Sequence, residues 1–184
     1  MNVQETSLPG VLLLEPRIFR DARGSFLEAW QRERYASEGL PRDFVQDNVS
    51  RSSRGVVRGL HLQNPQGQGK LVSVLLGEVF DVAVDVRVGS PTFGRWLGAT
   101  LSAENGRQLF LPEGFAHGFM VTSAEAVFHY KCTRPYSPAD ELTVRWDDPD
   151  LAIEWPAETP VLSDRDAAAP RLRDIPSDRL PRHG

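Results

Sequence analysis

Short segments in which apolar and polar residues alternate make up most of this chain. The clearest spans residues 71–86, where Phe80 and Val82 point to one side and Asp81 to the other. A period of two is typical of a β-strand. Gly77-Glu78 interrupts the segment and predicts a hairpin between its two halves.

Turn-forming residues divide the rest of the chain into similar segments. Strands are predicted at residues 11–19, 55–63, 94–102, 108–111, 119–122 and 126–133. Pro16 marks the first of these as an edge strand or a bend, and an exposed edge there would favour dimerisation by strand addition. Residues 21–24 predict a turn. Residues 29–38 are helix formers followed by Gly39, and they predict one short helix.

The chain changes character after Pro135, where Pro, Asp and Arg become frequent. Four apolar anchors are expected to pack this segment on the β-rich body: Trp146, Leu151, Ile153 and Trp155. Ser163 is suited to cap a short helix. The tail after about residue 175 is expected to be loosely ordered.

Length and composition describe one globular domain, residues 1–184. The chain has 40% apolar and 25% charged residues, and its 15 Gly and 14 Pro are spread along it without an internal repeat. These values are typical of a folded protein rather than a disordered one. Many short strands separated by Gly and Pro indicate a sandwich or a small barrel.

Charge and cysteine content narrow the class of partner and the compartment. The net charge of -4 argues against a general nucleic-acid binder. The single cysteine, Cys132, allows no internal disulfide and fits the reducing cytoplasm. The N-terminus lacks the pattern of a signal peptide, and no apolar run is long enough for a membrane span. We therefore expect a cytoplasmic protein with neither a nucleic-acid nor a membrane partner.

His61 is the strongest candidate for chemistry. It shares a strand face with Gln63, it follows Arg58-Gly59, and Lys70 lies close in sequence. A neutral imidazole beside cationic groups suits proton abstraction next to the carbonyl of an anionic substrate. The alternative is a histidine that only packs on its strand.

Other polar residues have two interpretations each. His117 either hydrogen-bonds across a turn or shares a cavity with Asp81. Asp81 itself either lies inside the protein, where it needs a partner, or lies on the solvent face. Lys70 is either solvated or stabilises an enolate oxygen. Tyr130, which faces opposite to His129, either packs or acts as a general acid.

Two histidines also raise the hypothesis of a metal site. Small β-barrels that hold iron, zinc or manganese typically carry two histidines one residue apart on one strand. Here position 63 is Gln, and no glutamate follows His61 at close spacing. Both observations argue against a metal.

The ordered motifs of the chain resemble the dTDP-4-dehydrorhamnose 3,5-epimerase family, from Glu15-Pro16-Arg17 to Leu162-Ser163. The matching segments include residues 21–26, 44–48, 54–61, 69–72, 77–85 and 114–119. The resemblance implies a cupin-type double-stranded β-helix (jelly roll) with a few short helices, a homodimer and no cofactor. It also implies epimerisation at C3 and C5 of dTDP-4-dehydro-6-deoxy-D-glucose through an enolate, in dTDP-L-rhamnose biosynthesis.

The resemblance further implies roles for individual residues. His61 would be the base, oriented by Asp166, with Tyr130 as the acid on the opposite sugar face and Lys70 steadying the enolate. Arg23, Arg58 and Arg165 would contact the diphosphate. The remaining substrate-binding residues would be Phe26, Glu28, Gln46, Asn48 and Tyr136 around the nucleotide, with Asp81, His117 and Phe119 nearby. Leu62, where many relatives carry an aromatic, and Asn64-Pro65 depart from the family pattern at the pocket edge.

Four alternatives stay open at this point. A C3-only epimerase of another deoxysugar pathway would use the same residues. A 3,4-ketoisomerase of the same fold fits the acid–base residues less well. A metal-dependent cupin oxygenase would need bound metal. A silent sugar or nucleotide binding module would bind dTDP without exchanging substrate protons with solvent.

Overall fold

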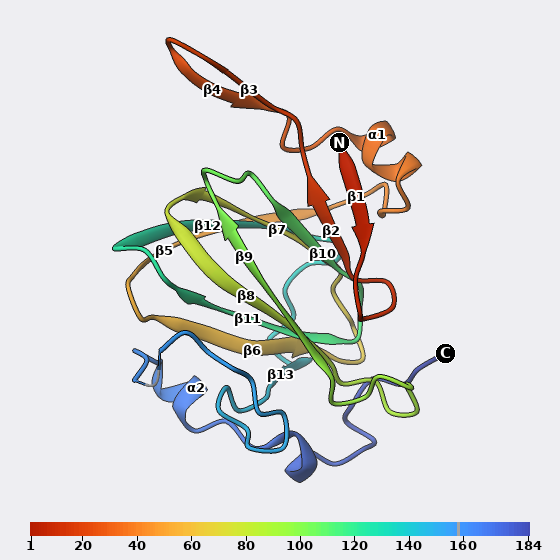
Figure 1. Cartoon of the computed structure of the whole chain (residues 1–184). Coiled ribbons are helices and arrows are strands. Elements are labelled where there is room, and N and C mark those ends of the chain that lie inside the picture. The colour runs from red at the N-terminus through yellow and green to blue at the C-terminus, as the bar shows by residue number, and fades with distance from the viewer. Residues whose placement is uncertain (158) are drawn as a thin grey trace.

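Two antiparallel sheets face each other in the computed structural model, which describes residues 1–157 and 159–184 (Figure 1). The larger sheet contains, in spatial order, β1 (Asn2–Glu5), β2 (Leu12–Glu15), β10 (Gln108–Leu111), β7 (Lys70–Leu76), β12 (Glu125–Cys132) and β5 (Gln46–Ser53). The smaller sheet contains β13 (Glu141–Thr143), β6 (Val57–Gln63), β11 (Phe115–Val121), β8 (Glu78–Asp85) and β9 (Trp96–Ser102). This confirms the predicted cupin-like jelly roll with few short helices.

The main core fills the space between the two sheets. Val72 and Phe128 from the larger sheet pack with Ala83 and Phe119 from the smaller one, and all four are buried. The rings of Phe119 and Phe128 stack with centroids 4.1 Å apart. Each large apolar side chain buried in this way contributes about 1.5–3 kcal/mol.

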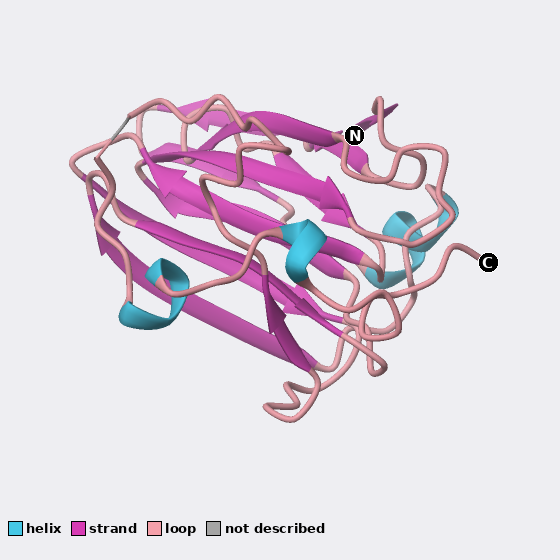
Figure 2. Cartoon of the chain, turned by 90° about the horizontal axis from the view of Figure 1, so that it is seen from below, coloured by secondary structure: helices cyan, strands magenta, loops and turns pink. Residues whose placement is uncertain are grey.

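The segment after Thr143 covers the outer face of the smaller sheet, so that both faces of β8 are buried. Val82 and Val84 point outward from β8 into a second core with Leu151, against which Ile153 and Trp155 pack. The helix α2 (Asp164–Ala167) and the 3-10 helix η1 (Leu172–Asp174) lie in this covering layer (Figure 2). The predicted anchoring of this segment is therefore confirmed.

The tail after Ile175 makes more contacts than the sequence predicts. Leu180 is buried in the second core. Val88 donates its backbone N–H to the carbonyl of Pro181 and accepts from His183. A loosely ordered tail was expected from its composition, but the apolar side chain and these hydrogen bonds hold it on the body.

The predicted short helix is present, and it packs against the larger sheet. It is α1 (Arg32–Ser37), which begins three residues later than expected because Gln31 caps it by accepting from the Arg34 N–H. Its buried Tyr35 packs with Trp30 in a third apolar cluster.

The predicted hairpin at Gly77-Glu78 is wrong. Gly77 does reverse the chain, with φ +76, but β7 and β8 belong to different sheets. β7 pairs with β10 and β12, whereas β8 pairs with β9 and β11. A local turn signal specifies a change of direction, and the two buried faces of β8 decide which strands become its partners.

The predicted N-terminal strand is divided at Pro16 by a bend, one of the two alternatives that the sequence allows there. Pro16 ends β2 at Glu15, and the chain continues in a separate hairpin of β3 (Ile18–Asp21) and β4 (Gly24–Leu27), whose turn is the one predicted. β2 is not an edge, because it pairs with both β1 and β10. The β3–β4 hairpin projects away from the body (Figure 1).

The buried carboxylate of Asp85 yields a stability prediction. It accepts from the Arg87 guanidinium and from the hydroxyls of Ser90 and Thr92, both at 2.6 Å. Burial alone would raise the pKa of Asp85, but these bonds lower it to about 2. Asp85→Ala leaves a largely buried guanidinium, 16% exposed, without its partner, so we expect a loss of about 3–5 kcal/mol in the free energy of unfolding.

The pH dependence of this contribution follows from the lowered pKa. Folding favours the ionised form, so the stabilisation is present above the ordinary pKa of 3.8 and is lost as pH falls toward 2. Urea unfolding at pH 7 and at pH 3 should show a smaller acid loss for Asp85→Ala than for the parent protein. Asp147→Ala, which breaks a partly exposed pair with Arg145, is the control and should cost at most about 1 kcal/mol. Equal stability of Asp85→Ala and the parent protein would contradict the prediction.

Candidate active site

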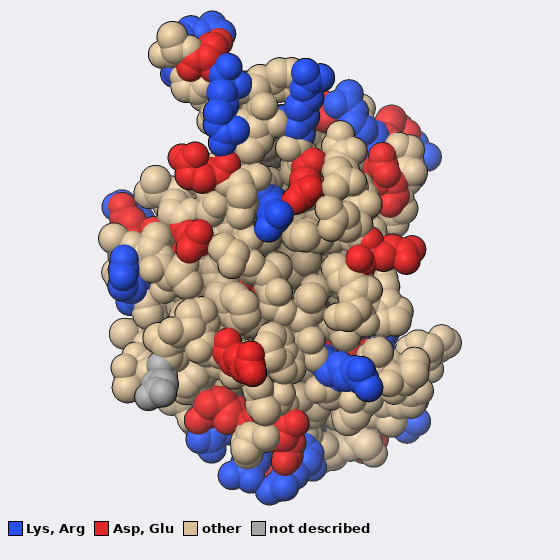
Figure 3. All heavy atoms as spheres, viewed as in Figure 1, with Lys and Arg blue, Asp and Glu red and all other residues tan. Residues whose placement is uncertain are grey.

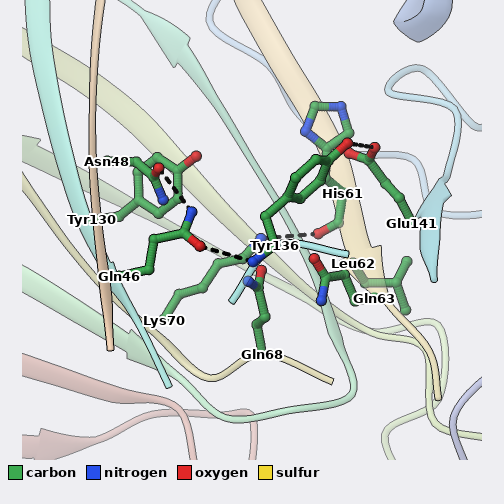
Figure 4. Close-up of a pocket in the computed structure, with 10 residues that line it drawn as sticks. All are labelled: Gln46, Asn48, His61, Leu62, Gln63, Gln68, Lys70, Tyr130, Tyr136 and Glu141. Carbon is green, nitrogen blue, oxygen red and sulfur yellow. Dashed lines mark hydrogen bonds between the residues drawn. The ribbon is translucent and has the colours of Figure 1, made fainter. Parts of the chain in front are cut away.

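A pocket of about 280 Å³ opens between the two sheets. Its lining residues come from β5, β6, β7, β12, β13 and the intervening loops (Figure 4): Gln46, Asn48, His61, Leu62, Gln63, Gln68, Lys70, Tyr130, Tyr136 and Glu141. The Leu62 side chain itself belongs to the second core. A second cavity of about 300 Å³ adjoins His61 and is lined by residues that include Arg58, Arg165 and Asp166.

His61 lies on the inner face of β6 and is paired with a buried carboxylate. Its Nε2 is 2.6 Å from Oδ1 of Asp166, whose side chain is 4% exposed. Burial alone would raise the pKa of Asp166, but the hydrogen bond and charge of His61 lower it. Asp166 is held in α2, which Ser163 caps as predicted by accepting from the Asp166 N–H. With Nε2–H directed at the carboxylate, Nδ1 is the nitrogen left to accept a proton.

The strand around His61 departs from simple alternation. A register shift between β6 and β11 places Arg58 opposite Phe119, whereas His61 lies opposite His117. The shift occurs where Gly59 crosses Gly118, so closely that a Cβ at Gly59 would lie 2.6 Å from the Gly118 Cα. His61 and Gln63 both line the pocket, as their predicted shared face requires, but the register shift interrupts the alternation between Arg58 and His61.

This shift turns Arg58 toward the space between the sheets. Its Nε donates to the Ser52 hydroxyl of β5, in the opposite sheet, at 3.1 Å. Arg58 therefore lines the cavity beside His61 instead of pointing into the second core.

Tyr130 lies across the pocket from His61, on β12 of the other sheet (Figure 4). His129 points to the outer face, where its ring lies 3.3 Å from the Ser73 hydroxyl, as the alternation predicts. Burial is the largest cause that raises the pKa of Tyr130. The phenol therefore keeps its proton at neutral pH and is able to donate it.

Lys70, the first residue of β7, reaches into the pocket between these two side chains. Its Nζ donates to the backbone carbonyl of His61 at 3.4 Å. Burial lowers the pKa of Lys70, and Cys132, Asp81 and Glu141 oppose the shift. An ammonium placed here is able to stabilise negative charge on a bound oxygen.

Asp81 and His117 form a second, deeper pair. Asp81 is fully buried, and His117 Nε2 lies 2.9 Å from its Oδ2. Asp81 therefore lies inside the protein and not on the solvent face. His117 lies opposite His61, and Phe119 lies opposite Asp81, but none of Asp81, His117 and Phe119 lines the pocket itself.

The predicted nucleotide-binding residues fall into two groups. Gln46, Asn48 and Tyr136 meet at the pocket, where Gln46 accepts from the Tyr136 backbone N–H at 2.8 Å and donates to Asn48 at 3.0 Å. Arg23 and Phe26 lie instead on the projecting β3–β4 hairpin, and Glu28 lies at its base, paired with Arg34. The Phe26 residue is 69% exposed.

Three pocket residues were missed by the sequence analysis as site candidates: Glu141, Gln63 and Gln68. Gln63 was noted only for sharing a face with His61. Glu141 is the first residue of β13, a strand of three residues that is too short to show a period. Glu141 accepts hydrogen bonds from both terminal nitrogens of Arg165, each at 2.6 Å. The sequence around either residue gives no sign of this pairing.

Within residues 1–157 and 159–184, no three His, Cys, Asp or Glu side chains are grouped so that they could hold a metal ion. The helices of this same part of the chain are all too short or too polar to cross a membrane. Acidic and basic side chains are interspersed over the face seen in Figure 3, and both occur on the projecting hairpin.

Known proteins resemble this chain over nearly its whole length. A 3,5-epimerase of dTDP-4-dehydrorhamnose from Shigella flexneri is 52% identical over 176 residues, which cover 95% of this chain and 97% of that protein. The crystal structure of an epimerase from Legionella pneumophila in complex with dTDP-4-keto-L-rhamnose superimposes with a TM-score of 0.96. The two sequences are 54% identical, and the match covers 100% of this chain and 98% of the Legionella chain.

A second solved structure shows how far the fold extends. A 3'-monoepimerase from Streptomyces bikiniensis, in complex with dTDP-quinovose, has a TM-score of 0.89 at 39% identity, with coverage of 96% of this chain and 91% of that one. The protein-family model described as dTDP-4-dehydrorhamnose 3,5-epimerase matches residues 5–174 of this chain. On this match and the identities above, the chain belongs to the dTDP-4-dehydrorhamnose 3,5-epimerase family.

Proposed function

We propose that this protein epimerises C3 and C5 of dTDP-4-dehydro-6-deoxy-D-glucose to give dTDP-4-dehydro-L-rhamnose, as its family membership indicates. One observation carries the chemistry: the His61–Asp166 pair and Tyr130 face each other across one pocket, with Lys70 between them. Epimerisation requires a base on one face of a carbon and an acid on the other, and this arrangement supplies both.

His61 removes the proton in the first step. The C–H bond next to the C4 ketone breaks, its electron pair forms the enolate, and the proton goes to Nδ1 of His61. Asp166 holds the ring orientation and stabilises the imidazolium that results. Lys70 stabilises the charge that develops on O4.

Tyr130 completes the inversion. Its phenol donates a proton to the opposite face of the same carbon, and solvent then restores the phenol and takes the proton from His61. The same pair of residues acts at C3 and at C5, because both carbons adjoin the ketone. Arg58 and Arg165 are placed to contact the diphosphate, and Gln46, Asn48 and Tyr136 to contact the nucleotide.

The main alternative is epimerisation at C3 alone. The 3'-monoepimerase from Streptomyces bikiniensis has the same fold at 39% identity, so the fold is compatible with either outcome. Incubation with dTDP-4-dehydro-6-deoxy-D-glucose in D₂O, followed by NMR, separates the two reactions. Deuterium at both carbons supports the 3,5-epimerase, and deuterium at C3 alone supports the alternative.

The same experiment tests the other classes of protein. Loss of labelling in the presence of a chelator would favour a metal-dependent cupin. Binding of dTDP without any labelling would favour a silent binding module. The single cysteine is a buried free thiol, which supports the proposed cytoplasmic location.

We also infer a homodimer in which the β3–β4 hairpin serves the partner's pocket. Arg23 and Phe26 are expected to bind substrate, yet they lie on a hairpin that leaves the body of their own chain (Figure 1). The hairpin exposes Phe19 and Phe26, and the larger sheet exposes Val49 and Leu75. Apolar side chains grouped on a surface are typical of an interface.

Mixing two inactive variants tests this arrangement. His61→Asn disables the pocket, and Arg23→Ala with Phe26→Ala disables the hairpin. If the hairpin acts on the partner, a mixed dimer contains one complete site, so the mixture should regain part of the activity after subunit exchange. A mixture as inactive as its components would contradict the inference.

A further inference from the structure

We propose that Glu141 is a positioning residue of this active site, which holds Tyr136 at the pocket and Arg165 at the adjoining cavity and places a carboxylate beside His61. The inference rests on the proposed function, because it assigns a role within the same pocket. The sequence pattern gives no signal at Glu141, because its strand has only three residues.

The carboxylate of Glu141 joins two side chains that approach it from different segments. Its Oε2 accepts the Tyr136 hydroxyl at 2.6 Å. Nη1 and Nη2 of Arg165 donate to Oε2 and Oε1, each at 2.6 Å. Bidentate pairs of this kind fix direction as well as distance, so Glu141 orients both partners.

Both partners would otherwise be mobile. The Tyr136 residue is 49% exposed, and the Arg165 side chain is 53% exposed, whereas that of Glu141 is 15% exposed. A long side chain at the surface loses rotational freedom when it binds a ligand. The Glu141 carboxylate is fixed in the pocket wall and already holds Tyr136 and Arg165. It therefore reduces the loss of rotational freedom when the nucleotide binds.

The register of β13 on β6 brings Glu141 close to the base. Glu141 lies opposite Gln63, and Thr143 lies opposite His61. Glu141 and His61 are therefore diagonal neighbours on one face of the sheet, within reach of long side chains. Figure 4 shows both side chains at the same end of the pocket.

The carboxylate is ionised in this position. Burial alone would raise the pKa of Glu141, but the bonds from Arg165 and Tyr136 lower it, and the charge of His61 acts in the same direction. The Glu141 hydrogen bond in turn raises the pKa of the Tyr136 phenol.

The backbone of the loop that carries Tyr136 is held independently of Glu141. The Tyr136 N–H donates to Gln46 and the Ser137 N–H donates to Gln63. Gln68 donates to the carbonyl of Arg134 in the same loop. Glu141→Gln should therefore release the two side chains without displacing the loop.

The first readout is the binding of nucleotide. We expect Glu141→Gln to raise KM for the sugar nucleotide, and the Kd of dTDP by calorimetry, roughly tenfold, the size of losing one charge-assisted hydrogen bond. kcat at the optimal pH should fall by a smaller factor, because His61, Lys70 and Tyr130 remain in place.

The second readout is the pH profile of kcat/KM. The charged and titratable groups around His61 are Asp166, Glu141, Lys70, Arg58, Arg165, Tyr130, Tyr136 and, on the neighbouring strand, His117 with its partner Asp81. Loss of the Glu141 charge leaves Arg165 unneutralised, and both changes disfavour the imidazolium. The neutral base therefore persists to lower pH, and the acidic limb of the profile should move to lower pH.

Two further variants make the test specific. Tyr136→Phe keeps the ring and loses the hydroxyl, so it should weaken dTDP binding less than Glu141→Gln, and the double variant should lose less than the sum of the two. Asp147→Asn removes a carboxylate from a bidentate arginine pair outside the pocket and should behave as the parent protein does.

Unchanged KM, dTDP affinity and acidic limb in Glu141→Gln would overturn the proposal. If Glu141→Gln does not fold, Tyr136→Phe decides: a loss of dTDP affinity supports the role, and parent-like affinity overturns it. An inactive parent protein would overturn the proposed function, whereas the dTDP measurements would still test Glu141.

Discussion

His61→Asn is expected to lower kcat for dTDP-4-dehydro-6-deoxy-D-glucose by about 10²–10⁴-fold, the usual contribution of one positioned base. Asparagine keeps a polar, neutral side chain at this position but cannot take up a proton at neutral pH. Deuterium should therefore enter neither C3 nor C5 in D₂O, because no enolate forms. NMR of the sugar during the reaction measures both turnover and labelling.

Two controls separate lost chemistry from lost structure. His183→Asn changes a histidine near the C-terminus, outside the residues that line the pocket, and should leave turnover unchanged. dTDP should bind to His61→Asn with an affinity near that of the parent protein, since the nucleotide contacts remain. Near-normal turnover of His61→Asn would show that another group is the base.

Tyr130→Phe should lower the rate of inversion by a similar factor of about 10²–10⁴, but with a different isotopic result. His61 and Lys70 remain, so the enolate still forms, and His61 returns a solvent-derived proton to the face from which it came. We expect deuterium to enter the starting sugar faster than the epimerised product appears. In the parent protein, each labelled carbon should be inverted.

The ratio of exchange to inversion is the measurement that decides this prediction. It requires NMR of both epimers over time, with dTDP affinity measured as a check that the pocket is intact. Loss of exchange and inversion together in Tyr130→Phe would assign Tyr130 a part in enolate formation. Parent-like inversion would exclude it as the acid.

The chemistry-bearing residues were readable from the sequence because their types and order carry the family resemblance. The sequence predicts His61, Lys70, Tyr130 and Asp166 as site residues, and the structure brings them together from β6, β7, β12 and α2. Their roles remain predictions that the variants above test.

Strand pairing was less accessible to sequence analysis. Gly77-Glu78 has the pattern of a hairpin, yet its two flanking strands join opposite sheets. The alternation in residues 55–63 gave no sign that the crossing of Gly59 with Gly118 would turn Arg58 inward. Both features depend on close approach between segments that are distant in the chain.

The sequence by itself determined the β-rich fold class, the turns, the capped helix at Ser163 and the identity of the acid–base residues. These follow from backbone propensity, period and side-chain chemistry, which are local properties. The tertiary structure alone decided which faces are buried, which strands pair and which groups meet. It placed Glu141 against Arg165 and Tyr136, and it carried Arg23 and Phe26 away from the pocket of their own chain. These relations are non-local, because they depend on how the two sheets pack and on which surface each segment covers.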